Sequence, residues 1–177
     1  MASNGSACKI PEHPDPDMDP ASEPRPDGPD RFDLDRFLTA QAGAFAQAVG
    51  DLRSGHKKSH WMWFIFPQFT GLGTSPMSQR YAIRSLAEAK AYLLHPLLGV
   101  RLLECTRIVN GLQGLSAHQI FGSPDDAKFH SSMTLFELAG GTGSEFTRAL
   151  EKYFSSERDR KTLGFVRDTG ARIDGET

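Results

Sequence analysis

The chain has 177 residues, of which 38% are hydrophobic and 24% are charged, and its formal net charge is −2. This length suits one domain of ordinary size with an extension. A charge so close to zero gives no overall attraction to nucleic acid or to anionic membranes, so neither partner is expected. No apolar run approaches the roughly 20 residues of a membrane-spanning helix, and no secretory signal is visible. We therefore expect a cytoplasmic protein.

The first 31 residues are rich in proline and acidic side chains and contain almost no apolar ones. Such a segment buries too little surface to offset the entropy lost on ordering. We predict a disordered tail over residues 1–31, a helical domain over residues 32–167 and a flexible C-terminus over residues 168–177. Cys8 lies in the tail and Cys105 in a helical pattern, which predicts neither a disulfide framework nor a metal set.

The domain begins with a helical pattern, and Asp33 is expected to cap it. Apolar residues recur along one face at helical spacing. Gly55 is expected to follow the end of this helix, or Gly50 to end it earlier. The residues of the apolar face are Leu34, Phe37, Leu38, Phe45, Val49 and Leu52.

Helix signals continue in chain order. Ser85 and Glu88 form a capping box for a helix that ends at Pro96, and Pro96 is expected to open the next helix at its first position. The buried face of that second helix carries Leu98, Leu102, Cys105 and Val109, and Gly111 and Gly114 interrupt it. Later starts are expected at Ser116 with Gln119, at Ser123 with Pro124 and Asp126 (stopped by Gly140 and Gly141), at Ser144, and at Asp159, which opens only a short turn.

Residues 61–66, WMWFIF, are six consecutive large apolar side chains. Aromatic residues and isoleucine favour extended structure, but a run this short has no diagnostic period. Strand patterns are scarce elsewhere, so we predict an all-α or nearly all-α domain. The run is expected at its centre, either as a short helix or as an extended segment, with most of its side chains in the core.

Polar residues around this run are the first candidates for a binding site. Gly71 and Gly73 precede Ser75 and Pro76, a pattern typical of a helix N-terminus, where free amides bind anions. Aromatic faces beside an anion site suit a nucleotide or another phosphorylated ligand with a ring. The alternative is that these residues only fill the core or cap helices. The candidates here are His60, Trp61, Trp63, Gln68, Ser75, Tyr81 and Arg84.

A second polar group occurs in residues 120–136, IFGSPDDAKFHSSMTLF. Two consecutive serines are unfavourable inside a buried helix unless they bond to a partner or a ligand. Although Asp, His and Ser occur together, no nucleophile elbow surrounds them, and neighbours on one helix seldom form a triad. Helix caps and a solvated face are the alternative interpretation. The candidates from this segment are Asp126, Lys128, Ser131 and Ser132.

Other catalytic signals are sparse. Glu104 lies in an apolar pattern and would be a general acid or base if it faced inward, although an outward position is commoner. The sequence contains no HExxH motif, CxxC pair or acidic cluster with metal-ligand spacing, so we expect no metal and no cofactor.

The two polar stretches and the helical segment between them, RYAIRSLAEAKAYLLHPLLGVRLLEC, resemble the bacterial and fungal family known as domain of unknown function 1810. The resemblance covers about residues 33–167 and implies a single, mostly helical domain. Some members carry the label calpastatin. Calpastatin inhibitors are disordered repeats, whereas this chain has a predicted core and no repeats, so the label has no physical support here.

A more remote analogy is to the NADAR superfamily, small helical proteins that act on ADP-ribose or related N-glycosides. That analogy implies a carboxylate near the glycosidic carbon and donors for the phosphates. Our first hypothesis is a cavity that binds a phosphorylated nucleotide-like or ADP-ribose-like metabolite, with its hydrolysis as an additional expectation. The alternative is a non-catalytic helical module that binds a protein partner. Under the first hypothesis, Gln68 or His60 should approach Lys128 or Ser131 across one cavity.

Overall fold

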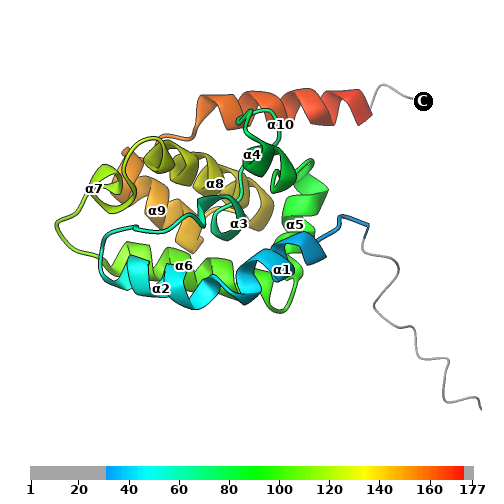
Figure 1. The fold of residues 1–177 in the computed structure, drawn as a ribbon. Helices are drawn as coiled ribbons and strands as arrows, with labels where there is room; N and C mark the ends of the chain where they lie inside the picture. Colours follow the sequence, from blue (N-terminus) through cyan, green and yellow to red (C-terminus); the bar gives the residue numbers. More distant parts are fainter. Residues whose placement is uncertain (1–30, 174–177) are drawn as a thin grey trace, which may run out of the picture. The chain divides into compact units, whose positions relative to one another are not determined.

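The computed structural model describes residues 31–173, so the tail predicted for residues 1–31 lies outside the described residues except for Arg31. The described residues form ten helices, and their only β contact is an isolated parallel bridge between Phe69 and Ile83. The all-α prediction is confirmed (Figure 1). The helices are α1 (Asp35–Ala42), α2 (Phe45–Arg53), α3 (Met62–Ile65), α4 (Pro76–Arg80), α5 (Leu86–Leu94), α6 (Leu98–Gly111), α7 (Ala117–Phe121), α8 (Asp125–Gly140), α9 (Glu145–Phe154) and α10 (Arg160–Ile173).

The N-terminal helix differs from its prediction, because α1 and α2 replace one continuous helix. Asp33 does not cap it: its backbone has φ of +52°, and no side chain bonds the first amides of α1. Arg36 holds this end instead, since its Nη1 donates to the carbonyl oxygens of Phe32 and Asp33. Gly55, with φ of +70°, follows the end of α2 as predicted.

Serine caps define several later helices. The hydroxyls of Ser75, Ser85, Ser116 and Ser144 each accept a hydrogen bond from the amide three residues on. Such bonds satisfy amides that have no partner inside the helix. Around Ser116 the full capping box is present, because Gln119 returns a bond to the Ser116 amide. These local predictions are confirmed.

Three expected helix ends are different in the structure. Glu88 accepts from the Arg84 amide rather than closing a box with Ser85. Pro96 does not open α6, which starts at Leu98; the ring Nδ1 of His95 accepts from the first amides there. Asp159 caps α10 through the Thr162 amide, but α10 is a 14-residue helix rather than a short turn. It runs past the expected boundary at residue 167.

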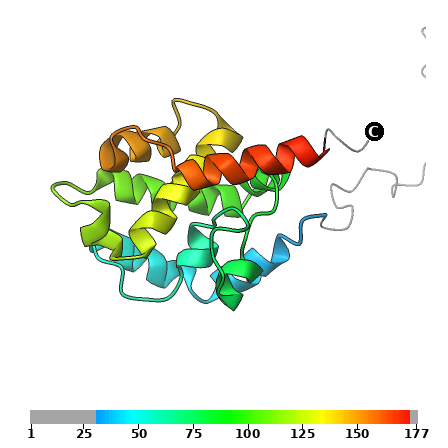
Figure 2. The ribbon, with the colours of Figure 1, turned by 90° about the horizontal axis from the view of Figure 1, so that it is seen from above.

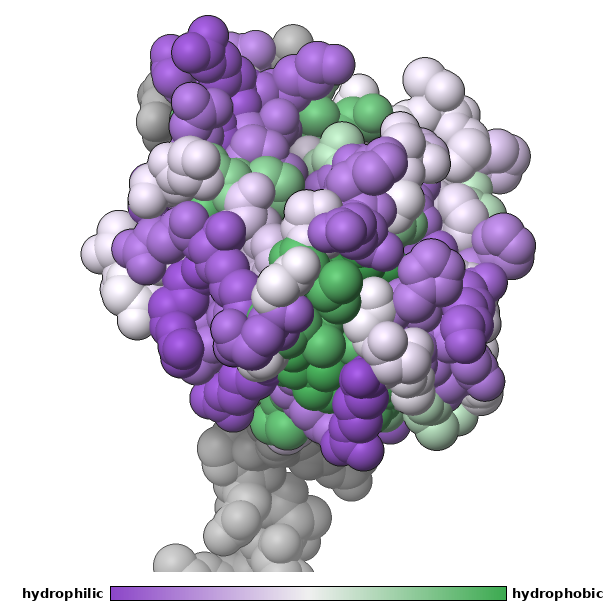
Figure 3. Space-filling model, turned by 90° about the vertical axis from the view of Figure 1, so that its left-hand side faces the viewer, coloured by the Kyte–Doolittle hydropathy of each residue, from purple (hydrophilic) through white to green (hydrophobic). Residues whose placement is uncertain are grey.

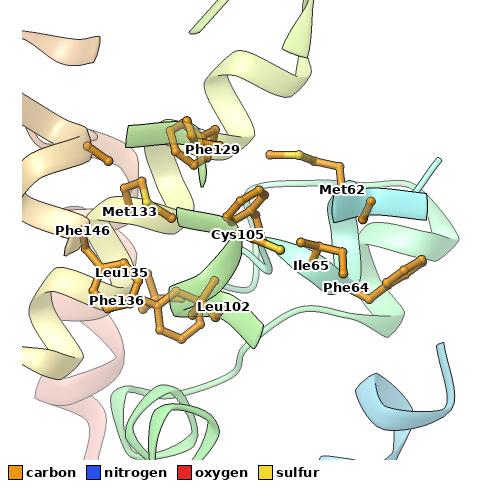
Figure 4. Close-up of a cluster of buried hydrophobic side chains, with 14 of the residues drawn as sticks. Met62, Phe64, Ile65, Leu102, Cys105, Phe129, Met133, Leu135, Phe136 and Phe146 are labelled. Atoms are coloured by element: carbon orange, nitrogen blue, oxygen red, sulfur yellow. The ribbon is translucent and has the colours of Figure 1, made fainter. Parts of the chain in front are cut away.

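Helix α8 is the centre of the packing, with α5, α7, α9 and α10 against it. Figures 1 and 2 show α10 crossing over α8. The run at residues 61–66 contains the short α3, and five of its six side chains are buried. Side chains of α3, α6 and α8 meet around Cys105 (Figure 4), and burial raises the pKa of this thiol to about 12. The labelled residues of that cluster are Met62, Phe64, Ile65, Leu102, Cys105, Phe129, Met133, Leu135, Phe136 and Phe146.

One buried ion pair ties α1 to α5. The Arg36 guanidinium bonds Glu88 Oε1, and the exposed fractions of the two side chains are 5% and 2%. Arg36 also donates to the carbonyl oxygens of Arg80 and Ala82, so the segment before α5 is held in the same network. Among the helices of residues 31–173, none has the length and hydropathy needed to cross a membrane.

Candidate functional site

A cavity of about 530 Å³ lies where the loop around residues 68–78 meets α8 and the start of α10. It is lined by residues of both polar stretches: Gln68 belongs to the first, and Lys128 and Ser131 belong to the second. The lining residues with polar or aromatic side chains are Trp63, Gln68, Thr74, Ser75, Ser78, Lys128, His130, Ser131, Asp159 and Lys161.

Trp63 and Lys128 form one wall of the cavity. The Lys128 ammonium lies 4.9 Å from the centroid of the Trp63 ring, a distance typical of a cation–π contact. Lys128 Nζ also bonds Asp125 Oδ1 at 2.6 Å, one helical turn away in α8. Asp125 Oδ2 in turn accepts from Lys57 Nζ at 2.7 Å. Burial raises the pKa of Asp125, but the bonds from Lys128 and Lys57 outweigh it and hold the pKa below its usual value.

Asp159 is the carboxylate among the described lining residues. Its Oδ2 accepts from the amide and hydroxyl of Thr162, at 2.9 and 2.6 Å, and from Ser131 Oγ at 3.1 Å. Burial raises the pKa of Asp159, but these hydrogen bonds outweigh it and lower the pKa below its usual value. The carboxylate is therefore ionised at neutral pH. No hydrogen bond from the described residues reaches its other oxygen, Oδ1.

His130 is held in one orientation beside Asp159. Its ring stacks on Phe154 with 4.1 Å between centroids and 10° between planes. Its Nε2 lies 2.8 Å from the carbonyl oxygen of Glu157. Because a carbonyl only accepts, Nε2 carries the proton, and in the neutral ring Nδ1 is left as an acceptor.

Residues 31–166 match the protein family described as "Protein of unknown function (DUF1810)". The chain belongs to the DUF1810 family. It is also similar to a solved structure, the conserved hypothetical protein Rv1873 from Mycobacterium tuberculosis, with 52% sequence identity and a TM-score of 0.77. That match covers 78% of this chain and 99% of Rv1873. No curated protein matches the chain.

Three of the sequence-predicted site residues of this DUF1810 domain are buried away from the cavity. Trp61 is 1% exposed, and its indole N–H donates to Asp51 Oδ2 at 3.0 Å. Tyr81 packs in the core with its ring 5.4 Å from that of Phe64. Ser132 is fully buried, and its hydroxyl has no hydrogen-bond partner among the described residues. Trp61 and Tyr81 thus follow the alternative expectation, that aromatic residues fill the core.

Three other predicted residues point away from the cavity. His60 is exposed and does not line the cavity. Arg84 lines another hollow, with Arg36 and Arg80. Asp126 points from α8 towards α7, where its carboxylate lies 2.8 Å from His118 Nδ1. Of the eleven predicted residues, those at the cavity are Trp63, Gln68, Ser75, Lys128 and Ser131.

The helix after Ser75 has few free amides for the anion site expected there. Helix α4 has only five residues, and Pro76 at its start has no N–H. The Ser78 and Gln79 amides already bond Ser75. The donors at this cavity of the DUF1810 domain therefore come mainly from side chains.

Sequence reasoning missed Asp159 and Lys161 as lining residues. Asp159 was identified only as a helix cap, and its bond to Ser131, 28 positions earlier, has no local signal. Glu104 faces outward and pairs with Arg53 at 3.9 Å, so it lies away from the cavity. In the described part of the DUF1810 domain, no three His, Cys, Asp or Glu side chains are grouped to hold a metal ion.

Proposed function

We propose that the cavity binds a small phosphorylated metabolite with a planar ring, such as a nucleotide or an ADP-ribose-like compound. The observation that carries this proposal is the combination of Trp63 with Lys128 and Lys161 in one cavity. The volume of about 530 Å³ falls within the range of sites for small molecules.

The cations of the cavity supply the attraction for phosphate. Lys161 has no ion-pair partner among the described residues, and Lys128 shares Asp125 with Lys57. The hydroxyls of Ser75 and Ser78 lie in the same lining and add donors. Bonds from a cation to a phosphate oxygen are among the stronger hydrogen bonds in proteins.

Trp63 supplies a surface for the ring. Its side chain is partly exposed, while its neighbours Met62 and Phe64 are buried. Stacking of a base on an aromatic ring contributes about 1–3 kcal/mol and depends little on the base. This tolerance supports a nucleotide-like class of ligand without selecting one base.

We also propose hydrolysis of an N-glycosidic bond as the reaction of this site. Asp159 is ionised and has a free Oδ1, so it suits stabilisation of the positive charge that develops at the sugar carbon. His130 lines the same cavity, and its Nδ1, an acceptor in the neutral ring, takes a proton from water in this proposal. The oxygen of this water then bonds to the sugar carbon, the C–N bonding electrons leave with the base, and the base takes up the proton held by His130.

A thermal-shift titration with ADP-ribose, ATP, ADP and ribose 5-phosphate tests the binding proposal. At least one compound should raise the melting temperature, because a ligand that binds only the folded state stabilises it. Lys161→Met should reduce that shift, whereas Lys90→Met, an exposed lysine of α5 outside this cavity, should not. A lack of stabilisation by all four compounds at millimolar concentration would contradict the proposal.

The reaction is tested separately with Asp159→Asn. Asparagine can still accept the Thr162 bonds that cap α10, so folding and binding should be retained. The rate at which the base is released from a bound N-glycoside, measured by chromatography, should fall by at least about a hundredfold. Turnover that is unchanged in the variant would rule out this role for Asp159.

Partner binding by a non-catalytic helical module is the second candidate. It is favoured by three exposed apolar side chains at the α5–α6 junction, Leu94, Leu97 and Val100, which are 84%, 42% and 60% exposed. Apolar surface bordered by hydrophilic side chains is also visible on the face that carries α7 (Figure 3). Leu94→Ser with Val100→Ser should leave metabolite stabilisation unchanged if the cavity is the functional site.

A further inference from the structure

One carboxylate lies between two lysines beside the cavity. Asp125 Oδ2 is 2.7 Å from Lys57 Nζ, and Asp125 Oδ1 is 2.6 Å from Lys128 Nζ. The side chains are largely covered, with exposed fractions of 9% for Lys57, 15% for Asp125 and 20% for Lys128. The three side chains together carry a net charge of +1 at a place where water has little access.

The fold sets the position of each cation separately. Lys57 is anchored by its amide, which donates to the carbonyl oxygen of Ile120 at 2.8 Å, and its ammonium lies 5.3 Å from the centroid of the Trp61 ring. Lys128 is one helical turn from Asp125 and lies over Trp63. Of the two lysines, Lys128 lines the cavity and Lys57 does not.

An excess charge that is shielded from water raises the free energy of the folded protein unless an anion lies beside it. If Lys57 were absent, Asp125 would neutralise Lys128 alone, and a ligand would meet a closed ion pair. With Lys57 present, the carboxylate is shared, and the excess charge is available at Lys128. The negative charge of Asp159 in the same cavity opposes anion binding. The affinity for an anion therefore depends more strongly on the excess positive charge at Lys128.

We propose that Lys57 is a positioning residue for anion binding: by sharing Asp125, it leaves the charge of Lys128 available to a phosphate group in the cavity. This inference rests on the proposed function. It assigns phosphate binding to the wall formed by Lys128 and Trp63. It also means that Lys57 affects the affinity for phosphate although it lies outside the cavity.

The test is a binding cycle on the full chain, with pyrophosphate, ADP and ADP-ribose as probes in calorimetric titrations at low salt. Lys57→Met removes the charge but keeps an unbranched side chain of similar length, and it should weaken binding of the probes about tenfold, a size typical of one charge near a buried site. Lys57→Arg should keep most of the affinity. Lys58→Met, its exposed neighbour, is the matched control and should change nothing.

Rescue distinguishes the electrostatic role from a structural one. Adding Asp125→Asn to Lys57→Met removes the neutralising charge and should return the affinity to within about twofold of the wild type. If Lys57 only supported the packing, the double variant would be at least as weak as the single one, and the inference would be overturned. If the wild type binds a probe and Lys57→Met binds it equally well, the inference about Lys57 is overturned, but the proposed function is not. Failure of the wild type to bind any of the three probes would overturn both.

Discussion

Trp61 and Trp63 are separated by one residue and lie in opposite kinds of surroundings. Trp61 is 1% exposed, and its N–H bonds Asp51. Trp63 is partly exposed and lines the cavity. Each ring has a lysine over its face, Lys57 at 5.3 Å and Lys128 at 4.9 Å. Trp61 immediately precedes the short α3 and Trp63 lies within it, and the turn of the backbone between them directs one indole to the core and the other to the cavity.

The carboxylates near the two tryptophans differ in the same way. Asp51 accepts four hydrogen bonds, from Trp61, Gln47 and the amides of Lys58 and Ser59, and these occupy both of its oxygens. Asp159 uses one oxygen for three bonds and keeps the other free. A polar group whose partners all belong to the protein stabilises the fold, whereas one with an unpaired atom at a cavity is available to a ligand.

The largest expected loss of stability comes from substituting the buried tryptophan, Trp61. Trp61→Leu should lower the free energy of unfolding by about 3 kcal/mol, because it leaves a cavity and removes the N–H donor of buried Asp51. Urea denaturation followed by circular dichroism measures this loss. A decrease below about 1 kcal/mol would show that Trp61 is not a core residue.

Asp51→Asn should have the next largest effect, about 2 kcal/mol at pH 7. Burial raises the pKa of Asp51, but the bonds from Trp61 and the amides of Lys58 and Ser59 outweigh it and lower the pKa from 3.8 to about 2. Since the folded pKa lies below the unfolded one, the ionised group stabilises the fold above pH 4, and this contribution is lost as the pH falls towards 2. The stability difference between wild type and variant should therefore shrink over that interval. A difference independent of pH would contradict this account.

Trp63→Leu should have the smallest effect on stability, about 1 kcal/mol, because the side chain is only partly buried. It should nevertheless remove most of the ligand-induced shift in melting temperature, since the stacking surface is lost. Trp61→Leu, measured at a temperature where it is folded, should keep ligand binding. If both variants lose binding equally, the division between the two tryptophans is wrong.

Local signals predicted much of the fold. A serine hydroxyl reaches an amide only three residues away, so Ser116 and Ser144 could be identified as caps from their immediate neighbours. The face of Leu102, Cys105 and Val109 could be read from helical spacing, and all three are buried. The break between α1 and α2 lies at Gly43 and Ala44, and it escaped prediction because the apolar face continues across it at helical spacing, from Leu38 to Phe45. At the start of α1, Arg36, whose partners include Glu88 far along the chain, takes the place of a cap by Asp33.

The sequence by itself determined that the protein is helical, where most of its helices begin, and that most of residues 61–66 belong to the core. Only the tertiary structure decided which tryptophan reaches the cavity and which carboxylate lines it. The physical reason is the range of the interactions. Caps and hydrophobic periodicity act within a few residues, whereas the cavity depends on Asp159 bonding to Ser131 and on Lys57 reaching Asp125, contacts that exist only after α8 has packed against segments distant in the chain.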